Sequence, residues 1–317
     1  MSKYIVTGCL GFIGSNLVER LLSSGHTVVG LDNQSTGFIE NIAVAATHPL
    51  FTFVEGDIRD IETCHSVCRG ADFVLHQAAL GSVPRSIEHP LLYNDNNITG
   101  TLNMLIAARD AKVKRMVLAS SSSVYGDTPT LPKIETMVPR PKSPYAISKM
   151  ATEYYAKVFN DVYGLQTVSL RYFNVFGPKQ TPNCQYAAVI PKFVTSFLNN
   201  IPPTIFGDGS QTRDFTFIDN VIQANLNSCI APDESCGLAY NIGCGDRISL
   251  NQLASDIKEI TQSTAAVIYA SPRAGDVKDS LASIDLSTAG LNLTDRVSLR
   301  EGLRTTINWY RNNMNER

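Results

Sequence analysis

The sequence predicts an α/β fold, in which a doubly wound parallel sheet is joined by a smaller, interleaved α/β region near the C-terminus. Through the first 175 residues, short apolar runs alternate with longer helical patterns, and the first run enters a glycine-rich turn that opens a helix. Such alternation indicates parallel strands with helical crossovers. The apolar runs are nearly continuous, which is typical of strands covered on both faces.

Six apolar runs are expected to form the strands of this sheet: Lys3–Thr7, His26–Leu31, Phe51–Glu55, Asp72–His76, Arg115–Ser120 and Thr167–Tyr172. Helical patterns between them include Phe12–Ser24, Ile98–Ala111 and Pro144–Tyr163. After about residue 175, Pro and Gly become frequent and the elements shorter. We therefore expect a first domain over residues 1–174, to which segments at roughly 210–240 return, and mainly a substrate-binding region over 175–317.

The first expected strand enters a GxxGxxG loop, Gly8-Cys9-Leu10-Gly11-Phe12-Ile13-Gly14, which opens the first helix. Glycines at these positions allow a tight turn and the close approach of a pyrophosphate to the helix N-terminus. A tight strand–helix turn can also use glycine without binding a ligand. The context favours a Rossmann-type site for a dinucleotide, in which the loop, Phe12 and Ile13 included, contacts the cofactor.

An acidic residue ends the second expected strand: Asp32, 18 residues after Gly14. A carboxylate there can accept hydrogen bonds from the adenosine ribose, although it could also cap a loop. It would repel a 2′-phosphate, and no Arg occurs between Asp32 and Glu55, so we expect NAD rather than NADP. Asp57 and Ile58 follow the third strand, where contacts to adenine are expected. Asp57 could equally be a helix N-cap.

Tyr145 and Lys149 are four residues apart on an expected helix and therefore share a face. We expect the ammonium, and the positive charge of an oxidised nicotinamide, to lower the pKa of the Tyr145 phenol. A phenolate could then remove a hydroxyl proton while hydride leaves the same carbon. No other Tyr-x-x-x-Lys occurs in the chain.

Four serines, Ser120 to Ser123, follow the strand that starts at Arg115. This places hydroxyls at the carboxyl end of the sheet, where folds of this kind bind ligands. They could form only a polar loop, but a hydroxyl there could also polarise a substrate oxygen and assist a proton transfer.

Length, charge and cysteine content narrow the class of protein. The chain has 317 residues and a formal net charge of −2 without a long basic run, which argues against nucleic acid or an anionic membrane as a partner. No apolar stretch suits a signal peptide or reaches the ~18 residues of a membrane helix, so we expect a cytoplasmic protein. Seven cysteines at irregular spacing, without a CxxC pair, support neither a metal site nor a disulfide framework. Cys64 and Cys68 are expected to be small buried residues.

Together these motifs resemble the extended short-chain dehydrogenase/reductase family, and within it the UDP-hexose 4-epimerases, particularly those that act on UDP-N-acetylglucosamine and UDP-N-acetylgalactosamine. The resemblance implies that Tyr145 is the catalytic base and that Ser121 is its hydrogen-bonding partner. It implies that Lys149 binds the nicotinamide ribose and tunes Tyr145. It also implies a homodimer formed through helices near Ile98–Ala111 and Pro144–Tyr163.

Elements that bind the UDP-sugar are also similar. Arg171-Tyr172-Phe173-Asn174 resembles the segment whose Asn contacts the nucleotide sugar, here Asn174. Gln211-Thr212-Arg213-Asp214-Phe215 resembles the segment whose Arg binds the diphosphate, here Arg213. In Arg273-Ala274-Gly275-Asp276, the resemblance places Arg273 on phosphate and Asp276 on the uridine ribose. Guanidinium groups suit a diphosphate, although each Arg taken alone could be a surface ion-pair partner.

The resemblance also bears on the sugar. Ser280, four residues after Asp276, occupies the position that faces the C2 substituent, and a small residue there leaves room for an N-acetyl group. We expect Ser82 and Val83 near the hexose, with Ser122 and Ser123 beside it. Many family members have Ala-Thr where this chain has Ser122-Ser123, and the serine-rich form also resembles uronate-sugar 4-epimerases.

Other functions of the same fold remain as alternatives. A 4,6-dehydratase needs an additional acid and base, and in that branch an Asp-Glu pair stands where this chain has Ser122-Ser123. A UDP-glucuronate decarboxylase carries a Glu there too. A non-catalytic NAD-binding sensor or scaffold could keep the glycine loop, but it would not need Ser121, Tyr145 and Lys149.

Overall fold

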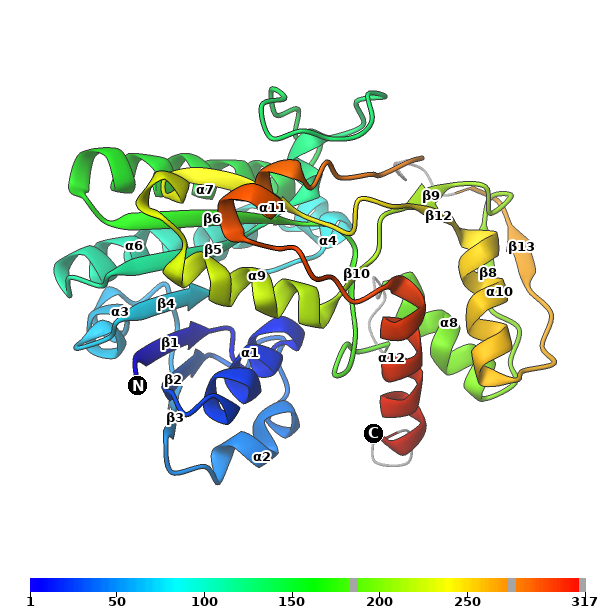
Figure 1. Ribbon diagram of the computed structural model, residues 1–317, viewed down its shortest axis with the longest axis horizontal. Helices are drawn as coiled ribbons and strands as arrows, with labels where there is room; N and C mark the ends of the chain where they lie inside the picture. Colours follow the sequence, from blue (N-terminus) through cyan, green and yellow to red (C-terminus); the bar gives the residue numbers. More distant parts are fainter. Residues whose placement is uncertain (183–187, 273–277, 314–317) are drawn as a thin grey trace.

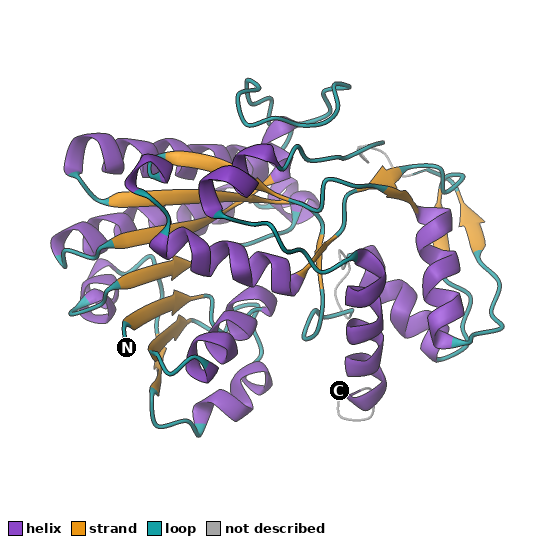
Figure 2. Cartoon of the chain, in the orientation of Figure 1, coloured by secondary structure: helices purple, strands orange, loops and turns teal. Residues whose placement is uncertain are grey.

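A parallel sheet forms the centre of the molecule. The computed structural model describes residues 1–182, 188–272 and 278–313. Within these ranges, seven parallel strands pair in the order β11-β6-β5-β4-β1-β2-β3. Their bounds are β1 Lys3–Thr7, β2 Thr27–Asp32, β3 Phe51–Glu55, β4 Phe73–His76, β5 Arg115–Ser121, β6 Gln166–Tyr172 and β11 Leu238–Ile242. The order reverses at β1, and the carboxyl ends of the strands point toward the smaller region (Figure 2). Ligands of doubly wound sheets bind at this position.

Helices cover both faces of the sheet (Figure 1). Apolar side chains of α1 (Phe12–Ser23) and α9 (Ile218–Ile230) pack in one core cluster with Val6 and Leu170. Side chains of α3 (Ile61–Cys68), α6 (Gly100–Asp110) and α7 (Pro144–Tyr163) pack in another cluster with Ile5. Ile5 and Val6 are neighbours in β1 and point to opposite faces, which is why the expected strands are nearly continuous apolar runs.

The helix that carries Tyr145 and Lys149 has strong signals at both ends. The Ser143 hydroxyl accepts a hydrogen bond from the backbone N–H of Ala146 at 3.1 Å, and Pro144 occupies the first turn. Gly164 follows the helix with a φ of 71°, in the left-handed region. A capping serine, an early proline and a terminal glycine explain why α7 begins and ends at the expected residues.

The smaller region lies to the right in Figure 1 and contains α8 (Val189–Leu198), α10 (Leu250–Thr261) and α12 (Leu299–Asn313). Short strand pairs join these helices: β8 (Thr204–Phe206) with β13 (Ile268–Ala270), and β9 (Thr212–Arg213) with β12 (Ile248–Ser249). Between them the chain returns to the sheet through β10 (Thr216–Phe217), which pairs with β7 (Val175–Phe176), and then through α9 and β11. The other α-helices in the described residues are α2 (Ala43–Ala46), α4 (Val83–Glu88), α5 (Pro90–Tyr93) and α11 (Asp285–Leu291).

The α-helix expected at Ile98–Ala111 begins two residues later in the structure, after a π-helical turn. Residues Asn94–Thr99 form a π-helical turn, and α6 starts only at Gly100. The Asn97 side chain is buried there, and its Nδ2 donates to the carbonyl of Leu80 at 3.1 Å and to the Ser148 hydroxyl at 2.9 Å. These tertiary contacts accompany the wide turn and are not visible in a sequence pattern.

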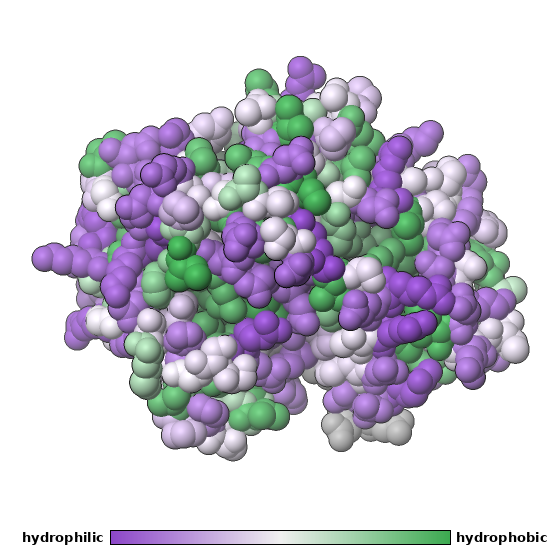
Figure 3. Space-filling view, in the orientation of Figure 1, coloured by the Kyte–Doolittle hydropathy of each residue, from purple (hydrophilic) through white to green (hydrophobic). Residues whose placement is uncertain are grey.

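The surface is of mixed polarity. Polar residues cover most of the face shown in Figure 3, and its outline is indented at the lower edge between the two regions. None of the helices in the described part of the chain is long and apolar enough to cross a membrane. Cys64 and Cys68 are buried, as expected.

Leu170→Ala in β6 is expected to lower the free energy of unfolding by about 2–5 kcal/mol, because Leu170 is fully buried and its truncation leaves a cavity. Ile230→Ala removes a side chain that is 78% exposed at the end of α9 and should change stability by less than about 0.5 kcal/mol. Urea unfolding of both variants measures the difference. Similar losses in the two variants would contradict this account of the core.

Candidate active site

The glycine loop brings backbone segments too close together for side chains. Gly8 has a φ of +68°, and a Cβ there would lie 2.8 Å from the backbone nitrogen of Ala78. A Cβ at Gly14 would overlap the carbonyl oxygen of Gly8. Gly11, the N-cap of α1, provides no side chain to bond the first N–H groups of the helix. These groups can therefore bind an anion such as a pyrophosphate, and the cradle fits a dinucleotide.

A cavity of about 90 Å³ adjoins the glycine loop, and its lining includes Asp32, Asn33 and Ile58. Asp32 accepts hydrogen bonds from the backbone N–H groups of Leu10 at 3.0 Å and Gln34 at 2.9 Å. Burial raises the pKa of its carboxyl. The carboxylate thus holds its own loop in place and also lines the cavity, so the two interpretations of Asp32 are compatible.

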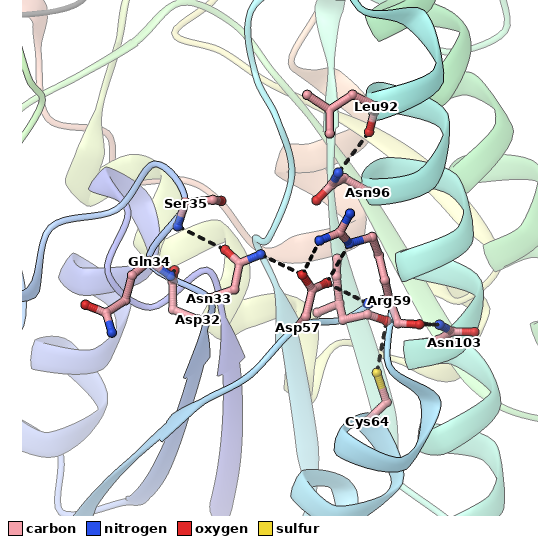
Figure 4. A network of polar contacts seen from close by, with 11 residues as sticks. Asp32, Asn33, Gln34, Ser35, Asp57, Arg59, Cys64, Leu92, Asn96 and Asn103 are labelled. Atoms are coloured by element: carbon pink, nitrogen blue, oxygen red, sulfur yellow. Dashed lines mark hydrogen bonds and ion pairs between the residues drawn. The ribbon is translucent and has the colours of Figure 1, made fainter.

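The N-cap interpretation of Asp57 is wrong. α3 begins only at Ile61, and its N-cap is Asp60, which accepts hydrogen bonds from the N–H groups of the first turn. Asp57 instead bonds Arg59, and this contact lowers the pKa of the Asp57 carboxyl to about 2. Ile58 is buried beside Gly100, where a Cβ would overlap it. Figure 4 shows the contact between Asp57 and Arg59.

The expected reactive residues come together at the carboxyl ends of β5 and β6. Tyr145 and Lys149 lie one turn apart on α7, and the Ser121 hydroxyl, at the end of β5, hydrogen bonds the phenol of Tyr145. Lys149 is buried, and its Nζ donates to the carbonyl of Ala119 at 2.7 Å. A phenol, a hydroxyl and an ammonium at this edge are suited to moving a proton at a substrate hydroxyl.

The expectation that Lys149 lowers the pKa of Tyr145 is wrong for the protein's own groups. Burial raises the pKa of the phenol, and only the hydrogen bond from Ser121 acts in the opposite direction. The Lys149 ammonium is bound to the carbonyl of Ala119. Burial also lowers the pKa of Lys149 to about 8, against the raising effect of Glu153. A positive charge that lowers the pKa of Tyr145 would therefore have to come from the cofactor.

Tyr93 contacts both Tyr145 and the loop with Ser82 and Val83, which is expected near the substrate. The rings of Tyr93 and Tyr145 are 6.4 Å apart in an edge-on arrangement. The hydroxyl of Tyr93 accepts a hydrogen bond from the backbone N–H of Ser82 at 3.1 Å. Ser82 is the N-cap of α4, and Val83 begins that helix with a partly exposed side chain. Tyr93 was missed because no spacing in the sequence connects it with Tyr145.

A buried ion pair behind Tyr145 and Lys149 was also missed. Glu153 lies one turn after Lys149, and its carboxylate accepts hydrogen bonds from Arg171 at 2.9 and 2.7 Å and from the Ser120 hydroxyl. Both side chains of the pair are at most 9% exposed. The i, i+4, i+8 spacing of Tyr145, Lys149 and Glu153 is the signal that could have indicated it.

Ser122 and Ser123 open a short 3₁₀ turn after β5. The backbone N–H of Ser123 donates to the Ser121 hydroxyl at 3.2 Å. Among the described side chains, the Ser123 hydroxyl is a buried polar group without a hydrogen-bond partner. A buried hydroxyl of this kind is a candidate donor to a ligand.

The expected UDP-binding residues form a second group. Asn174 donates through Nδ2 to the carbonyl of Asp214 at 2.8 Å and to the Ser280 hydroxyl at 3.1 Å. Arg213 donates to the carbonyls of Thr212 and Lys278, both at 2.9 Å. Asn174 and Arg213 line a cavity of about 540 Å³ that α8 and β8 also border. The structure thus brings Asn174, Arg213 and Ser280 together, whereas Arg273 and Asp276 lie outside the described residues.

Asp214 fixes the loops around this second group. Its buried carboxylate accepts hydrogen bonds from the backbone N–H groups of Cys244 at 2.8 Å, Gly245 at 3.1 Å and Ala282 at 3.1 Å. Burial raises the pKa of Asp214 to about 6, although these bonds act in the opposite direction. The segment that carries Ser280 is therefore held to the neighbouring loop from inside the protein.

Comparison with known proteins identifies relatives along nearly the whole chain. Residues 4–243 match the family model described as "NAD dependent epimerase/dehydratase family". The UDP-glucose 4-epimerase of Mycolicibacterium smegmatis is 36% identical over 98% of this chain and 99% of its own length. The UDP-glucuronate 4-epimerase of Thermodesulfobacterium geofontis is 35% identical over 99% of this chain and 98% of its own length.

Among solved structures, the UDP-N-acetylglucosamine 4-epimerase of Methanobrevibacter ruminantium M1, in complex with UDP-N-acetylmuramic acid, superposes with a TM-score of 0.94. It is 39% identical, and the match covers 99% of each chain. Sequence and architecture therefore agree on one family of proteins.

Lys149→Met is expected to raise the free energy of unfolding at about pH 7. The pKa of Lys149 in the folded protein, about 8, lies below the 10.5 of an ordinary lysine. Between these values the unfolded chain binds more protons, so the stability that depends on Lys149 rises with pH. Below pH 8 the buried ammonium should cost on the order of 3 kcal/mol.

Urea unfolding of the wild-type protein and the Met variant, at about pH 7 and again at about pH 10, measures this effect. The advantage of the variant should shrink at the higher pH. An equal advantage at both pH values would contradict an effect of the buried charge.

Proposed function

The chain belongs to the NAD dependent epimerase/dehydratase family, and from that premise we propose that it inverts carbon 4 of UDP-N-acetylhexosamines. Its class is that of the UDP-sugar 4-epimerases, which are isomerases, and its cofactor is NAD. The proposed reaction interconverts UDP-N-acetylglucosamine and UDP-N-acetylgalactosamine through a transient 4-keto sugar, and UDP-glucose and UDP-galactose are further candidate substrates. The observation that carries this proposal is the convergence of Ser121, Tyr145 and Lys149 where β5 meets α7, in the same sheet whose β1 enters the glycine loop.

In this mechanism Tyr145 takes the proton from the C4 hydroxyl, and the Ser121 hydroxyl supports the phenolate by hydrogen bonding. When bound, NAD would accept the hydride that leaves carbon 4 and would later return it. Lys149 would hold the nicotinamide ribose. Once the keto sugar has presented its opposite face and carbon 4 has regained the hydride, Tyr145 would return the proton to the oxygen.

The 540 Å³ cavity is the proposed place of the UDP group. Arg213 would bind the diphosphate, because a guanidinium matches phosphate oxygens in a bidentate manner. Asn174 would contact the nucleotide sugar, and Arg273 and Asp276 would complete the site. Residues 1–174, with the segments that return to them, would thus bind NAD, and residues 175–317 would mainly bind the UDP-sugar.

Preference for an N-acetylated sugar rests on Ser280. Its small side chain hydrogen bonds Asn174, so a sugar seated at Asn174 would also lie near Ser280. The similar structures include the M. ruminantium protein, which is named as a UDP-N-acetylglucosamine 4-epimerase. A small residue at this position leaves space that a bulky aromatic ring would fill.

A second candidate substrate is a UDP-uronate. The buried, unpartnered hydroxyl of Ser123 in the described part of the chain is the observation that favours it. A uronate carboxylate at this position could accept a hydrogen bond from Ser123. The T. geofontis relative is named as a UDP-glucuronate 4-epimerase.

We also propose that the protein is a homodimer that pairs through α7 and α6. Ile147, Tyr154, Val158 and Val162 are exposed on α7, and their spacing of 7, 4 and 4 residues places them on one face of the helix. A continuous apolar stripe on a long surface helix is typical of an interface. A second copy, related by a twofold axis, would cover this stripe with its own.

Val158→Glu is expected to convert the dimer to a monomer, because the dimer would bury two charges in an apolar interface. Ile230→Glu, at an even more exposed apolar position at the end of α9, should leave the dimer intact. Light scattering after size exclusion gives the mass of each variant. A monomeric wild-type protein, or a dimeric Val158→Glu variant, would contradict the proposal.

Tyr145→Phe is expected to lower turnover at least ~100-fold, because the base is removed, while bound NAD is retained. Tyr269→Phe, at an exposed tyrosine of β13, is the matched control and should be fully active. The assay incubates UDP-N-acetylglucosamine with the purified protein without added NAD and follows the sugar by proton NMR. Turnover of the Tyr145 variant near that of the wild type would overturn the assigned chemistry.

The same assay separates the candidate substrates. Formation of UDP-N-acetylgalactosamine supports the N-acetylated sugar and a retained cofactor together. Conversion of UDP-glucuronate to UDP-galacturonate alone would keep the mechanism and replace the substrate. Absence of activity with every UDP-sugar, despite bound NAD, would favour a non-catalytic sensor.

A further inference from the structure

A single short segment lies between the loop of residues 80–82, which leads into α4, and the helix that carries Tyr145. The segment, residues 93–97, contains the last residue of α5 and the start of the π-helical turn before α6. Two of its side chains, Tyr93 and Asn97, are buried and contact both the 80–82 loop and α7. The loop and the helix are therefore joined through these two side chains.

Both side chains hold the loop by its backbone. The hydroxyl of Tyr93 accepts a hydrogen bond from the N–H of Ser82 at 3.1 Å. Oδ1 of Asn97 accepts from the N–H of Leu80 at 2.8 Å, and its Nδ2 donates to the Leu80 carbonyl at 3.1 Å. The place of the loop, and with it the position from which Ser82 faces the site, is thus set by buried groups behind it.

The same two side chains also hold α7 beside the candidate base. The rings of Tyr93 and Tyr145 meet edge-on, with planes 88° apart and centroids 6.4 Å apart, a favoured geometry that fixes one ring against the other. Nδ2 of Asn97 donates to the Ser148 hydroxyl at 2.9 Å, and that hydroxyl donates to the carbonyl of Tyr145 at 2.7 Å. Tyr93 therefore contacts the ring of Tyr145, whereas Asn97 acts on its backbone.

We propose that Tyr93 is a positioning residue for the reaction at carbon 4, in which its hydroxyl places the 80–82 loop against the sugar and its ring holds the phenol of Tyr145 at the C4 hydroxyl. This inference rests on the proposed function, because the sugar has to lie between the loop and Tyr145. A base and a bound hydroxyl react efficiently only in the correct geometry, and a small misplacement removes much of the rate. One side chain that contacts both parts sets the sugar and the base relative to each other.

The first variant, Tyr93→Phe, removes the hydroxyl and keeps the ring. It should bind UDP-sugars about five- to tenfold less tightly than the wild type, because one hydrogen bond to the loop is lost. The dissociation constant for UDP should not change, because UDP carries no sugar that could meet the loop. Calorimetric titration of the NAD-loaded protein with UDP, UDP-N-acetylglucosamine and UDP-glucuronate gives these constants. Two sugars are used so that the result does not depend on which of them the protein converts.

The second variant, Tyr93→Leu, removes the ring as well. Its KM for the sugar should rise about as much as that of Tyr93→Phe, since both variants lack the hydroxyl. Its kcat should fall at least ~tenfold below that of Tyr93→Phe, because the phenol of Tyr145 is no longer held in place. The kcat of Tyr93→Phe should stay within about twofold of the wild type, because the ring is kept. Proton NMR of the sugar conversion gives both kinetic constants.

Tyr240→Phe is the matched control for the loss of a buried hydroxyl. Tyr240 is 1% exposed, as is Tyr93, and its hydroxyl donates to the carbonyl of Ser235 at 3.1 Å. It lies on β11 and packs against Gly290 of α11. Urea unfolding should show similar losses of stability in Tyr240→Phe and Tyr93→Phe, while the control keeps the wild-type affinities, KM and kcat.

The ratio of the affinities for UDP and UDP-sugar separates positioning from a purely structural role. If Tyr93→Phe behaved like Tyr240→Phe and kept this ratio, the proposal would be overturned. A wild type that binds neither sugar nucleotide more tightly than UDP would also overturn it, since the loop would then not contact the sugar. Equal kcat values in the two Tyr93 variants would contradict the role of the ring.

Failure of the proposed reaction would look different from failure of this inference. In that case the wild type would bind a UDP-sugar more tightly than UDP and convert none of them. The titrations would still decide on the hydroxyl of Tyr93, because they do not require turnover.

Discussion

The ion pair between Arg171 of β6 and Glu153 of α7 joins the elements that carry the candidate active site. Its carboxylate also bonds Ser120 of β5, the neighbour of Ser121. The Arg171 guanidinium reaches the Tyr125 hydroxyl at 2.8 Å, which donates onward to Asn241 of β11. Three strands and α7 thus meet at one buried pair. Loss of either partner would leave an uncompensated charge in the interior, which typically costs about 3–5 kcal/mol.

Burial at this junction shapes the chemistry of the site as well as its stability. It raises the pKa of the Tyr145 phenol and lowers that of the Lys149 ammonium, so both groups are shifted toward their neutral forms. Within the described residues, the counteracting contacts are the hydrogen bond from Ser121 and the charge of Glu153. A positive charge such as that of oxidised nicotinamide would lower the pKa of the Tyr145 phenol. Stability given up at reactive groups in this way is common in enzymes.

Much of the fold follows from local signals in the sequence. β1, β3 and α7 occupy the expected residues, because continuous apolar runs, a capping serine and a terminal glycine are local features. Features that depend on tertiary contacts could not be predicted from the sequence. The wide turn before α6 accompanies the contacts of Asn97, and Asp57 is held by Arg59 and Asn33 while Asp60 caps α3.

The same contrast between local signals and tertiary contacts applies to the residues of the candidate site. Residues within a motif, such as Tyr145 and Lys149, could be named from the sequence, because their spacing occurs once and follows the glycine loop in the expected order. Tyr93 and Arg171 could not, because they reach the site from separate elements. The direction of the Tyr145 pKa shift was wrong because spacing carries no information on burial.

The return of the chain to the sheet limits how this protein can be divided into fragments and how it can vary between relatives. β11 follows β10 and α9 only after the chain has already built α8 and β8 of the smaller region. A fragment that ended before this return would leave β6 as an uncovered edge, and unpaired strand edges promote association between chains. The two regions are therefore not modules that recombination could exchange at a single junction. Relatives would have to differ by substitutions within the loops at the carboxyl edge of the sheet. The order in which the chain connects the strands and helices would stay the same.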